Sequence, residues 1–389
     1  MMDVILTVSK FIGLMVIVTG VVQYTNYFTQ LVLATIQLMS SGKAARPDAL
    51  WRRYSDTVPP IAILVPAFNE EKTIVESLSS LMAMQYPNYE VVIINDGSSD
   101  GTLDVLIKAF GLKKTSRLYS PLAPHEPIRA IYRSPHQKRI VVIDKANGGK
   151  SDALNAGINV SRAPLFCCVD ADSVLEPDAL LRTVKPFMED PERTVAVGGT
   201  VRIANGSIIR NGQILKVQLP KKLLPLLQTV EYLRAFLMTR LAWSQLNTVL
   251  IISGAFGLFR RDAVLQVGGY SLGTVGEDME LVVKLHRDLR ERKQDYRIKF
   301  IPEPVCWTEA PETLEVLRNQ RTRWQRGTLE TFERHGKMAF NPRYGLVGVI
   351  GFGNILISDV IGPVVDAIGY ILFPILAITG TLPLDYFLA

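Results

Sequence analysis

Apolar residues are concentrated at both ends of the chain, and short apolar runs alternate with amphipathic segments between them. Residues 4–39 are mostly apolar, although polar residues such as Lys10 and Asn26 interrupt the run. About 20 apolar residues are enough to cross a bilayer. No positive region precedes the run and no small-residue cleavage site follows it, which argues against a cleaved signal peptide. We therefore expect residues 1–40 to form an N-terminal transmembrane segment.

The C-terminal region, residues 345–389, is also apolar and contains Asp359 and Asp366. It has room for two short spans, or for one interfacial segment and one span. Ionisable groups inside such a segment usually face protein or water rather than lipid. The sequence ends within apolar residues, so we expect either that the chain is truncated after Ala389 or that partner subunits or further copies complete the membrane part.

Basic residues flank both apolar ends. The linker 41–57 carries four of them, and residues 315–343 hold seven Lys and Arg against three Glu. Because basic flanks stay on the cytoplasmic side, we expect 41–57 and the segment 311–344 to face the cytoplasm. The whole chain is then a multi-pass protein of the inner or plasma membrane with a cytoplasmic central domain. The basic residues of the linker are Lys43, Arg46, Arg52 and Arg53.

The central region, residues 58–310, alternates apolar strand-like runs with helix-like segments. Such alternation predicts an α/β domain with a mostly parallel sheet covered on both faces. Residues 111–139 are rich in Pro, Arg and Lys, and we expect a loop insertion there. The predicted strands are 61–66, 90–96, 140–144 and 163–172, and the predicted helices begin near Glu71, Ser151 and Glu176.

Two carboxylates stand at the end of the fourth predicted strand, in Asp170-Ala171-Asp172. Residues two apart on an extended chain point to the same side, where these carboxylates could hold a divalent cation together with waters and phosphate oxygens. The alternative is that Asp172 or Ser173 caps the following helix. Asp96 ends the second strand at the same sheet edge, where it could bind a uracil base or a ribose. Its alternative is a local Asx-turn.

Two turns at this edge are candidates for binding a nucleotide. The first strand ends in a turn whose backbone groups could contact a nucleotide, and a glycine-bearing turn later in the chain leads to Lys150 and a helix. Helix N-termini and nearby Lys favour phosphate, although the spacing is not that of a Walker motif. The residues of the first turn are Pro66, Ala67, Asn69 and Glu70.

Composition narrows the class of protein. Charged residues make up 21%, mean hydropathy is +0.18, net charge is +6 and pI is about 9.1. Basic proteins often bind nucleic acid, but here the basic residues cluster beside the apolar segments, so we expect no nucleic-acid partner. The three cysteines form neither a metal-binding spacing nor an even disulfide set, which fits a reducing compartment.

Six motifs in order, VPAFNE, NDGSSDGT, NGGKSDALN, DAD, GED and QRTRW, resemble those of family 2 glycosyltransferases. The resemblance is to the membrane-embedded, processive-like branch, which includes cellulose, chitin, hyaluronan and poly-N-acetylglucosamine synthases. It covers about residues 58–340 and the flanking apolar segments. It implies a GT-A-type nucleotide-sugar-binding domain held by terminal membrane and interfacial helices.

The resemblance also implies roles for the acidic residues. Asp96 would contact the uridine, and Asp170, Ala171 and Asp172 would meet the nucleotide and its metal, Mg²⁺ or Mn²⁺. Asp172 is the expected metal ligand, with Asp170 as a second candidate. Asp278 would be the base that deprotonates the acceptor hydroxyl. Its alternative role is electrostatic capping of the helix that begins at the GED motif.

The QRTRW motif would contribute two further groups. Arg323 would face the diphosphate, for which its planar fork is suited, and Trp324 would stack on the acceptor sugar. The alternative for Trp324 is a core or interfacial aromatic anchor. Small residues near 252–257 could admit a sugar ring or pack at a tight turn. The expected acceptor-binding residues are Ser253, Gly254, Glu277, Gln320 and Trp324.

The resemblance implies inverting transfer of a sugar from a UDP-sugar to a growing β-linked polysaccharide. One alternative is transfer of a single sugar to a lipid carrier or another membrane acceptor. A non-catalytic binding or export subunit is the alternative of another class, and the intact acidic motifs argue against it. Residues 223–246 have apolar residues at helical spacing, which fits a helix on a membrane surface, in contact with lipid, as well as an ordinary core helix.

Overall fold

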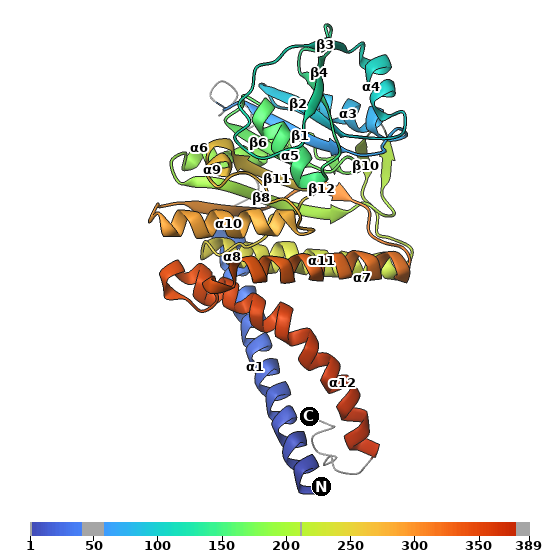
Figure 1. Cartoon of the computed structure of the whole chain (residues 1–389). Coiled ribbons are helices and arrows are strands. Elements are labelled where there is room, and N and C mark those ends of the chain that lie inside the picture. The colour runs from blue at the N-terminus through green and yellow to red at the C-terminus, as the bar shows by residue number, and fades with distance from the viewer. Residues whose placement is uncertain (1, 41–57, 211, 379–389) are drawn as a thin grey trace.

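The computed structural model describes residues 2–40, 58–210 and 212–378. The predicted linker 41–57 and residues 379–389 lie outside the described residues. At the centre is a ten-stranded sheet with the order β3-β4-β5-β2-β1-β6-β11-β8-β12-β7 (Figure 1). Its strands are β1 Ile61–Ala67, β2 Tyr89–Asp96, β3 Lys113–Thr115, β4 Ile128–Arg133, β5 Ile140–Lys145, β6 Leu165–Val169, β7 Val174–Leu175, β8 Thr194–Ile203, β11 Phe256–Arg260 and β12 Arg297–Thr308.

The parallel part of the sheet follows from continuous apolar runs. β1 pairs in parallel with β2 and β6, β2 pairs in parallel with β5, and β8 pairs in parallel with β12. Residues 61–64 of β1 are completely buried, as expected of a strand covered on both faces. The predicted mostly parallel α/β sheet is therefore confirmed, and all four predicted strands form within three residues of their expected ends.

The sheet is nevertheless mixed. β11 lies antiparallel between β6 and β8, and β7 is antiparallel to β12. The expectation of a loop insertion at 111–139 is wrong, because β4 pairs antiparallel with β5 and β3 pairs antiparallel with β4, so both extend the sheet. β4 is short and lies near the sheet edge with its faces only partly buried, so its apolar pattern is too weak to stand out in the sequence.

Helices cover the sheet and present the predicted turns. The three predicted helices begin within three residues of the positions expected from the sequence. For α5 the difference is one residue, which is within the usual uncertainty of helix ends. Every residue of α5 after its first is buried, because this helix packs against β1 and β2. The helices of this layer are α3 Ile74–Met82, α4 Thr102–Phe110, α5 Lys150–Val160, α6 Ala179–Glu189 and α9 Arg261–Gln266.

A second helical layer lies beneath the sheet (Figure 1). It contains a continuous helical run of α7 (Leu223–Leu233), the π-helical η1 (Arg234–Arg240) and α8 (Leu241–Gln245), together with α10 (Glu277–Glu291) and α11 (Leu314–His335). The run 223–246 packs on the sheet through part of its surface, but several of its large apolar side chains are exposed. They include Leu223, Leu227 and Val230. This element thus packs on the sheet and also has an exposed apolar surface, while its contact with a membrane stays a prediction.

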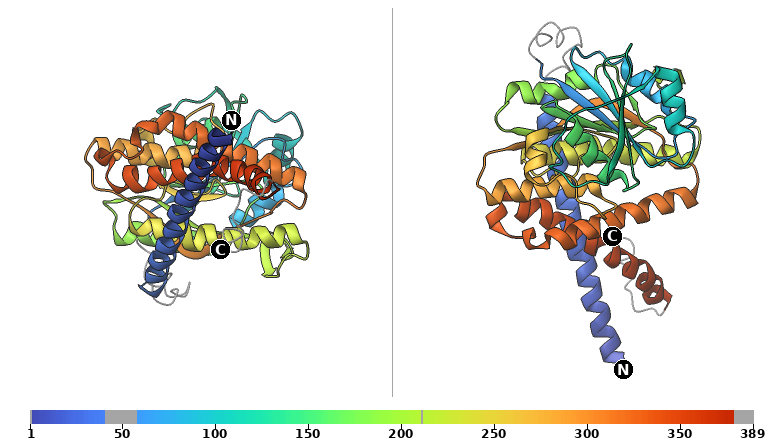
Figure 2. Two further views of the ribbon diagram at one scale, coloured as in Figure 1. Left: turned by 90° about the horizontal axis from the view of Figure 1, so that it is seen from below. Right: turned by 45° about the horizontal axis from the view of Figure 1, so that its top comes forward.

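Two helical segments project from this layer on the same side (Figures 1 and 2). One is α1 (Met2–Ser40), and the other is the run η4 (Val347–Phe352), η5 (Ile355–Ile361) and α12 (Gly362–Ile378). Polar side chains join them where they leave the body. Asn26 donates to Asn354 at 2.6 Å and accepts from Gln30 at 3.1 Å.

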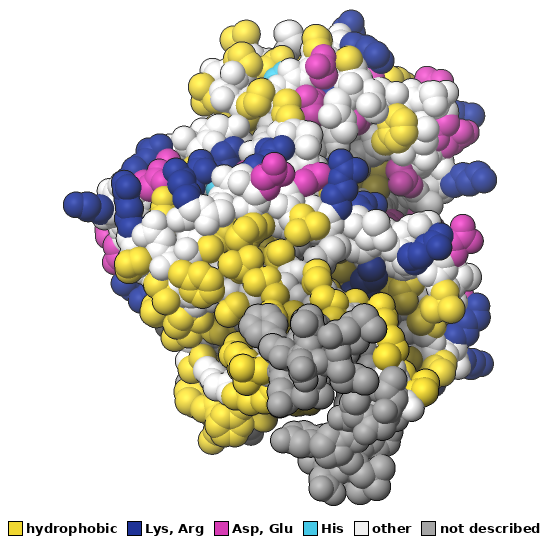
Figure 3. Space-filling model, turned by 60° about the horizontal axis from the view of Figure 1, so that its bottom comes forward, with side chains coloured by type: hydrophobic (Ala, Val, Ile, Leu, Met, Phe, Trp, Pro, Cys, Tyr) yellow, Lys and Arg dark blue, Asp and Glu magenta, His cyan; other side chains and the backbone are white. Residues whose placement is uncertain are grey.

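Within the described part of the chain, one helix, Val347–Ile371, is long and apolar enough to cross a membrane by length and composition. Figure 3 shows apolar side chains gathered on the face of the body from which the projecting segments leave. The N-terminal span and the multi-pass topology remain predictions.

Candidate active site

The carboxyl ends of β1, β2, β5 and β6 meet at one edge of the sheet, as parallel strands require. Asp96 is the last residue of β2, and Asp170 directly follows β6. The turn after β1 reaches the same edge. Strand direction therefore brings the predicted donor residues at the strand ends together in space, as expected for a ligand site in an open α/β sheet, whereas Arg323 lies apart from the strand ends, on α11 (Leu314–His335).

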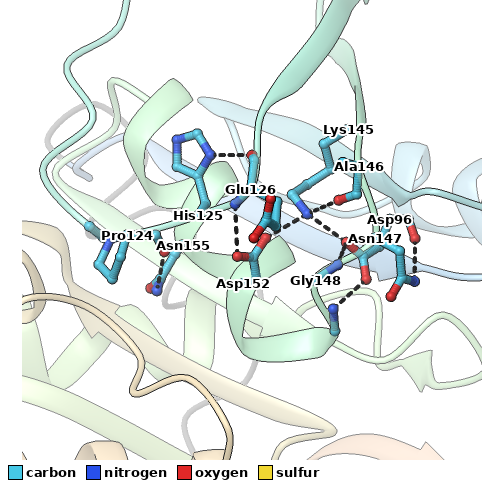
Figure 4. A network of polar contacts seen from close by, with 12 residues as sticks. Asp96, Pro124, His125, Glu126, Lys145, Ala146, Asn147, Gly148, Asp152 and Asn155 are labelled. Carbon is cyan, nitrogen blue, oxygen red and sulfur yellow. Dashed lines mark hydrogen bonds and ion pairs between the residues drawn. The ribbon is translucent and has the colours of Figure 1, made fainter.

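Asp96 organises the glycine turn that precedes α5 (Figure 4). Its side chain is 4% exposed. The carboxylate accepts from the backbone N–H groups of Gly148 at 3.0 Å and Gly149 at 2.7 Å, and its main-chain oxygen accepts from Asn147 at 2.7 Å. These partners lie about 50 residues away in the sequence, so the carboxylate does not form the local Asx-turn that was the alternative. A direct contact to the nucleoside stays a prediction.

Lys145 is the group that sequence reasoning missed at this point. Its ammonium group is completely buried and lies 2.6 Å from Asp96 and 2.5 Å from Asp152 (Figure 4). Asp152 also accepts from the backbone N–H of Glu126 at 2.8 Å. A buried ammonium between two carboxylates is stable only when its protons and the acceptor oxygens are paired. The register that places Lys145 opposite Asp96 across β5 and β2 was the missing signal.

The turn after β1 is tied to the turn after β2. Asn69 has a left-handed backbone, with φ of 58°, and its side chain accepts from the backbone N–H of Ser99 at 2.9 Å. The backbone N–H of Glu70 donates to Thr102 at 2.9 Å. Pro66 and Ala67, the other predicted donor-binding residues here, are the last two residues of β1. The two turns therefore form one connected rim.

Lys150, the first residue of α5, joins the two halves of the site. Its ammonium group lies 2.6 Å from Asp170 and 3.0 Å from Glu277, the first residue of α10. Burial alone would lower the pKa of Lys150, but Asp170 and Glu277 hold that pKa well above its usual range. The group therefore stays charged at neutral pH and neutralises part of the surrounding acid cluster.

Asp278 is held beside Lys150 at the start of α10. One carboxylate oxygen accepts from the backbone N–H of Gly254 at 3.0 Å and the other from that of Met279 at 2.8 Å. Burial and the neighbouring charge of Glu277 raise the pKa of Asp278. The N-cap residue is Gly276, and Asp278 reaches across to a different segment. Capping alone therefore does not account for its position.

The small-residue segment 252–257 packs directly on this acid cluster. A Cβ atom at Gly254 would lie 3.0 Å from the Lys150 ammonium and 3.6 Å from Asp278. The adjacent Ser253 accepts from the backbone N–H of Ala255 at 3.4 Å. Gly254 thus lets the backbone approach the charged groups closely, whereas an acceptor role for Ser253 and Gly254 remains a prediction.

Asp172 keeps an exposed side chain at the same sheet edge. Its pKa is raised by partial burial and then by the negative charges of Asp170 and Glu70. The alternative in which Asp172 or Ser173 caps the next helix is wrong, because α6 begins at Ala179 and its N-cap is Asp178.

The carboxylates here fit a divalent cation that keeps other ligands. The described residues contain no cluster of three or more His, Cys, Asp or Glu side chains arranged to hold a metal. However, the charges of Asp170 and Glu70 disfavour the ionised form of Asp172, and a bound cation would relieve that repulsion. Mg²⁺ commonly binds through one or two carboxylates plus waters and substrate phosphates. Such a set needs no third protein ligand.

The QRTRW motif lies on α11 beneath the sheet. Trp324 is 42% exposed, so the alternative of a core aromatic is wrong, and the guanidinium of Arg321 lies 4.5 Å from its ring centre. Arg321 is itself held by two 2.6 Å bonds to Glu231 of α7. Arg323 is exposed and forms no ion pair with the described residues.

Gln320 lines a cavity of about 770 Å³ at the carboxyl ends of β8 and β12. Its side-chain oxygen is buried without a hydrogen-bond partner among the described residues. The cavity has carboxylate and amide walls from Glu309, Glu312 and Asn205. These side chains offer hydrogen-bonding groups, and no Lys or Arg in the described part of the chain lines the cavity.

The sequence model of glycosyl transferase family 2 matches residues 62–268, which is more than half of the chain. This chain belongs to glycosyl transferase family 2. The matched range includes the donor-side turns, the strand-end acids and Gly254, while Asp278 and the QRTRW motif follow it. The resemblance to this family is therefore confirmed.

Similar curated proteins carry the name poly-beta-1,6-N-acetyl-D-glucosamine synthase. The one from Staphylococcus epidermidis is 31% identical over 274 residues, covering 70% of this chain and 56% of that protein. The one from Staphylococcus aureus strain COL is 32% identical over 280 residues, covering 72% of this chain and 57% of that protein. The chain thus spans little more than half the length of these relatives.

Among solved structures, the chain resembles a mannosyltransferase from Pyrobaculum calidifontis that was solved in complex with GDP-Man and Mn²⁺. The TM-score is 0.62 at 18% sequence identity, covering 95% of this chain and 89% of that one. This likeness extends over almost the whole chain. It shows a shared GT-A-like fold.

Proposed function

We propose that this family 2 protein is a membrane-bound inverting glycosyltransferase that extends a β-linked polysaccharide from a UDP-sugar. The observation that carries the proposal is the Lys150 bridge. It places Asp170, on the donor side, and Glu277, next to the expected base Asp278, around one ammonium group. UDP-N-acetylglucosamine is the first donor to test, because the curated relatives are named as N-acetylglucosamine polymer synthases.

In the proposed reaction the acceptor hydroxyl oxygen attacks the anomeric carbon. A new glycosidic bond forms while the bond from that carbon to the diphosphate breaks, and UDP leaves with the bonding electrons. The hydroxyl proton passes to the Asp278 carboxylate. A base of raised pKa suits this task, because proton transfer is most effective when the pKa lies closer to the working pH.

On the donor side we assign the nucleotide to the rim formed by residues 66–70, Asp96 and Lys150. Asp172, with Asp170 as a second ligand, would hold Mg²⁺ or Mn²⁺. The bound cation would neutralise charge that builds up on the departing diphosphate. Arg323 is available for the same phosphates because its guanidinium has no ion-pair partner among the described residues. Arg suits a diphosphate through its bidentate fork.

On the acceptor side we assign Trp324 to stack on the sugar ring, with Ser253, Gly254, Glu277 and Gln320 around it. An exposed indole with one guanidinium neighbour can offer ring surface to a sugar. We further propose that residues 58–310 form the catalytic domain, that 311–344 form the interfacial segment, and that the two projecting helical segments anchor the protein in the inner or plasma membrane. The catalytic domain then faces the cytoplasm.

The test is to incubate membranes containing the full chain with a panel of labelled UDP-sugars, with GDP-mannose as a further donor. The product is then sized. We expect incorporation from one UDP-sugar into a long polymer. A product of one sugar on a lipid would favour the single-transfer alternative, and transfer from none of the donors would overturn the proposal.

A further inference from the structure

One face of α11 forms hydrogen bonds with the turn that precedes the expected base, Asp278. Glu330 accepts from the hydroxyl of Thr274 at 2.9 Å and from the backbone N–H of Val275 at 3.0 Å, both through the same carboxylate oxygen. One turn further along, Arg334 donates to the backbone oxygens of Leu272 at 3.3 Å and Gly273 at 3.4 Å. Residues 272–276 directly precede α10, whose second residue is Asp278.

The same face approaches the turn as closely as two backbones can. A Cβ atom on Gly327 would lie 2.7 Å from the Cα of Gly276, and a Cβ atom on Gly276 would lie 2.8 Å from the Cα of Gly327. Both obstacles are backbone atoms, which cannot swing aside. Gly327, Glu330 and Arg334 are three, four and seven residues apart, so they lie on one side of the helix.

A second attachment fixes α10 to α11 further from the turn. His335, buried at the end of α11, bonds to the buried carboxylate of Glu280 at 3.1 Å and accepts from Arg287 at 3.0 Å. Thr328 also contacts the sulfur of Met279 at 3.9 Å. α11 therefore contacts residues both before and after Asp278 in the sequence.

We propose that Glu330 is a positioning residue that fixes Asp278 relative to the acceptor-binding part of α11. Trp324 precedes Gly327 by three residues, which corresponds to about 4.5 Å of helix rise. The helix that carries the expected acceptor aromatic therefore also carries the groups that hold the base. The inference rests on the proposed function, because it gives Glu330 a role in that same transfer.

The physical reason is the steep dependence of transfer on geometry. A displacement of about 1 Å between reacting groups can cost about 100-fold in rate. Without the Glu330 carboxylate, the Thr274 hydroxyl and the Val275 N–H lose their acceptor, and Arg326 loses its ion-pair partner. The start of α10, which carries Asp278, then loses one of its attachments to α11, while the donor rim, on the other side of Lys150, is untouched.

The central experiment compares Glu330→Ala with two matched variants in full-length protein. Glu333→Ala removes an exposed carboxylate from the same helix, where it has no hydrogen bond or ion pair with the described residues. Glu330→Gln keeps an amide oxygen in the place of the oxygen that accepts from both Thr274 and Val275. We expect Glu330→Ala to lower kcat by about 10- to 100-fold with an unchanged KM for the donor, and Glu330→Gln to restore most of the rate.

A second measurement does not depend on turnover. Hydrogen–deuterium exchange of the Val275 amide should be faster in Glu330→Ala than in wild type or Glu333→Ala. Thr274→Val, which removes one of the two bonds, should give a smaller effect of the same kind and serves if Glu330→Ala does not fold.

The outcomes separate the two proposals. Wild-type protein that transfers no sugar overturns the proposed function, whatever the exchange shows. Wild-type protein that transfers sugar, together with an unchanged kcat in Glu330→Ala, overturns the positioning role. Equal loss in Glu330→Ala and Glu330→Gln, or unchanged exchange at Val275 in Glu330→Ala, also overturns it.

Discussion

Replacing Asp278 with Asn tests the expected base. Although the two side chains have nearly the same size, the substitution also changes the hydrogen bonds of this position. Each carboxylate oxygen of Asp278 accepts from a backbone N–H, one from Gly254 and one from Met279. An Asn side chain has a single oxygen, so its NH₂ group must face one of these two donors. A buried donor left without an acceptor costs about 1–3 kcal/mol.

A gain offsets part of this loss. Burial and Glu277 raise the pKa of Asp278, which means that the fold disfavours its charged form. This penalty is absent at low pH, where Asp278 is protonated in both states; it grows as pH rises from the ordinary Asp pKa to the raised pKa of the folded state, and is complete above it. Removal of the charge should therefore favour the variant at neutral pH. We expect the free energy of unfolding to fall by less than the full 1–3 kcal/mol or so expected from the lost bond.

The effect on transfer should be much larger. General base catalysis contributes about 10²- to 10⁴-fold, equivalent to about 2.7–5.5 kcal/mol of activation free energy. The assay measures kcat at saturating donor, UDP affinity by calorimetry and thermal unfolding on the same preparation. The wild-type rate should also fall as pH drops through the raised pKa of Asp278, above the range of an ordinary Asp, because protonation removes the base.

Asp288→Asn is the matched control, since Asp288 lies on the same helix in an ion pair with Arg292. We expect Asp288→Asn to transfer sugar at the wild-type rate. Asp278→Asn that transfers sugar at the wild-type rate would refute the base assignment. A rate loss matched by an equal loss of UDP affinity would show that Asp278 binds the donor instead.

Three further predictions concern the metal site, the close approach at Gly254 and a buried histidine. Asp172→Ala should weaken Mn²⁺-dependent UDP binding by at least about tenfold, and equal UDP affinity with and without EDTA in wild-type protein would count against a metal. Gly254→Ala places a methyl group 3.0 Å from the flexible Lys150 ammonium. The free energy of unfolding should therefore change by about 1 kcal/mol or less, while the rate of sugar transfer falls about tenfold or more. An unaltered rate would contradict this. Burial lowers the pKa of His286 to about 4. The contribution of the neutral imidazole to the free energy of unfolding should therefore be complete above about pH 6.5 and fall by up to about 3 kcal/mol as pH drops towards 4, as measured by urea unfolding. His286→Gln should flatten this pH dependence, and an unchanged dependence on pH in the variant would argue against it.

Much of the fold and the donor side could be read from local sequence. Continuous apolar runs predicted β1, β2, β5 and β6, because strands buried on both faces must be apolar throughout. Once these strands are parallel, their carboxyl ends share an edge, so Asp96 and Asp170 had to converge. The order of the short motifs is enough to identify the family.

Pairing direction and distant partners were decided only by the tertiary structure. The antiparallel placement of β11, and the addition of β3 and β4 to the sheet, depend on long-range pairing that a local apolar pattern does not encode. Lys145 became informative only when the register set it between Asp96 and Asp152. Likewise, Glu330 is an ordinary helical acid in the sequence.

The acid cluster shows the division most clearly. Sequence motifs named Lys150, Glu277 and Asp278 separately, but more than a hundred residues separate the first from the other two. Their grouping around one ammonium, and the close approach of Gly254 to it, follow from the tertiary structure, which brings the first residues of α5 and α10 and the segment at 254 together. Local composition determines which residues can be charged and where strands end, whereas only the folded chain determines which charges meet.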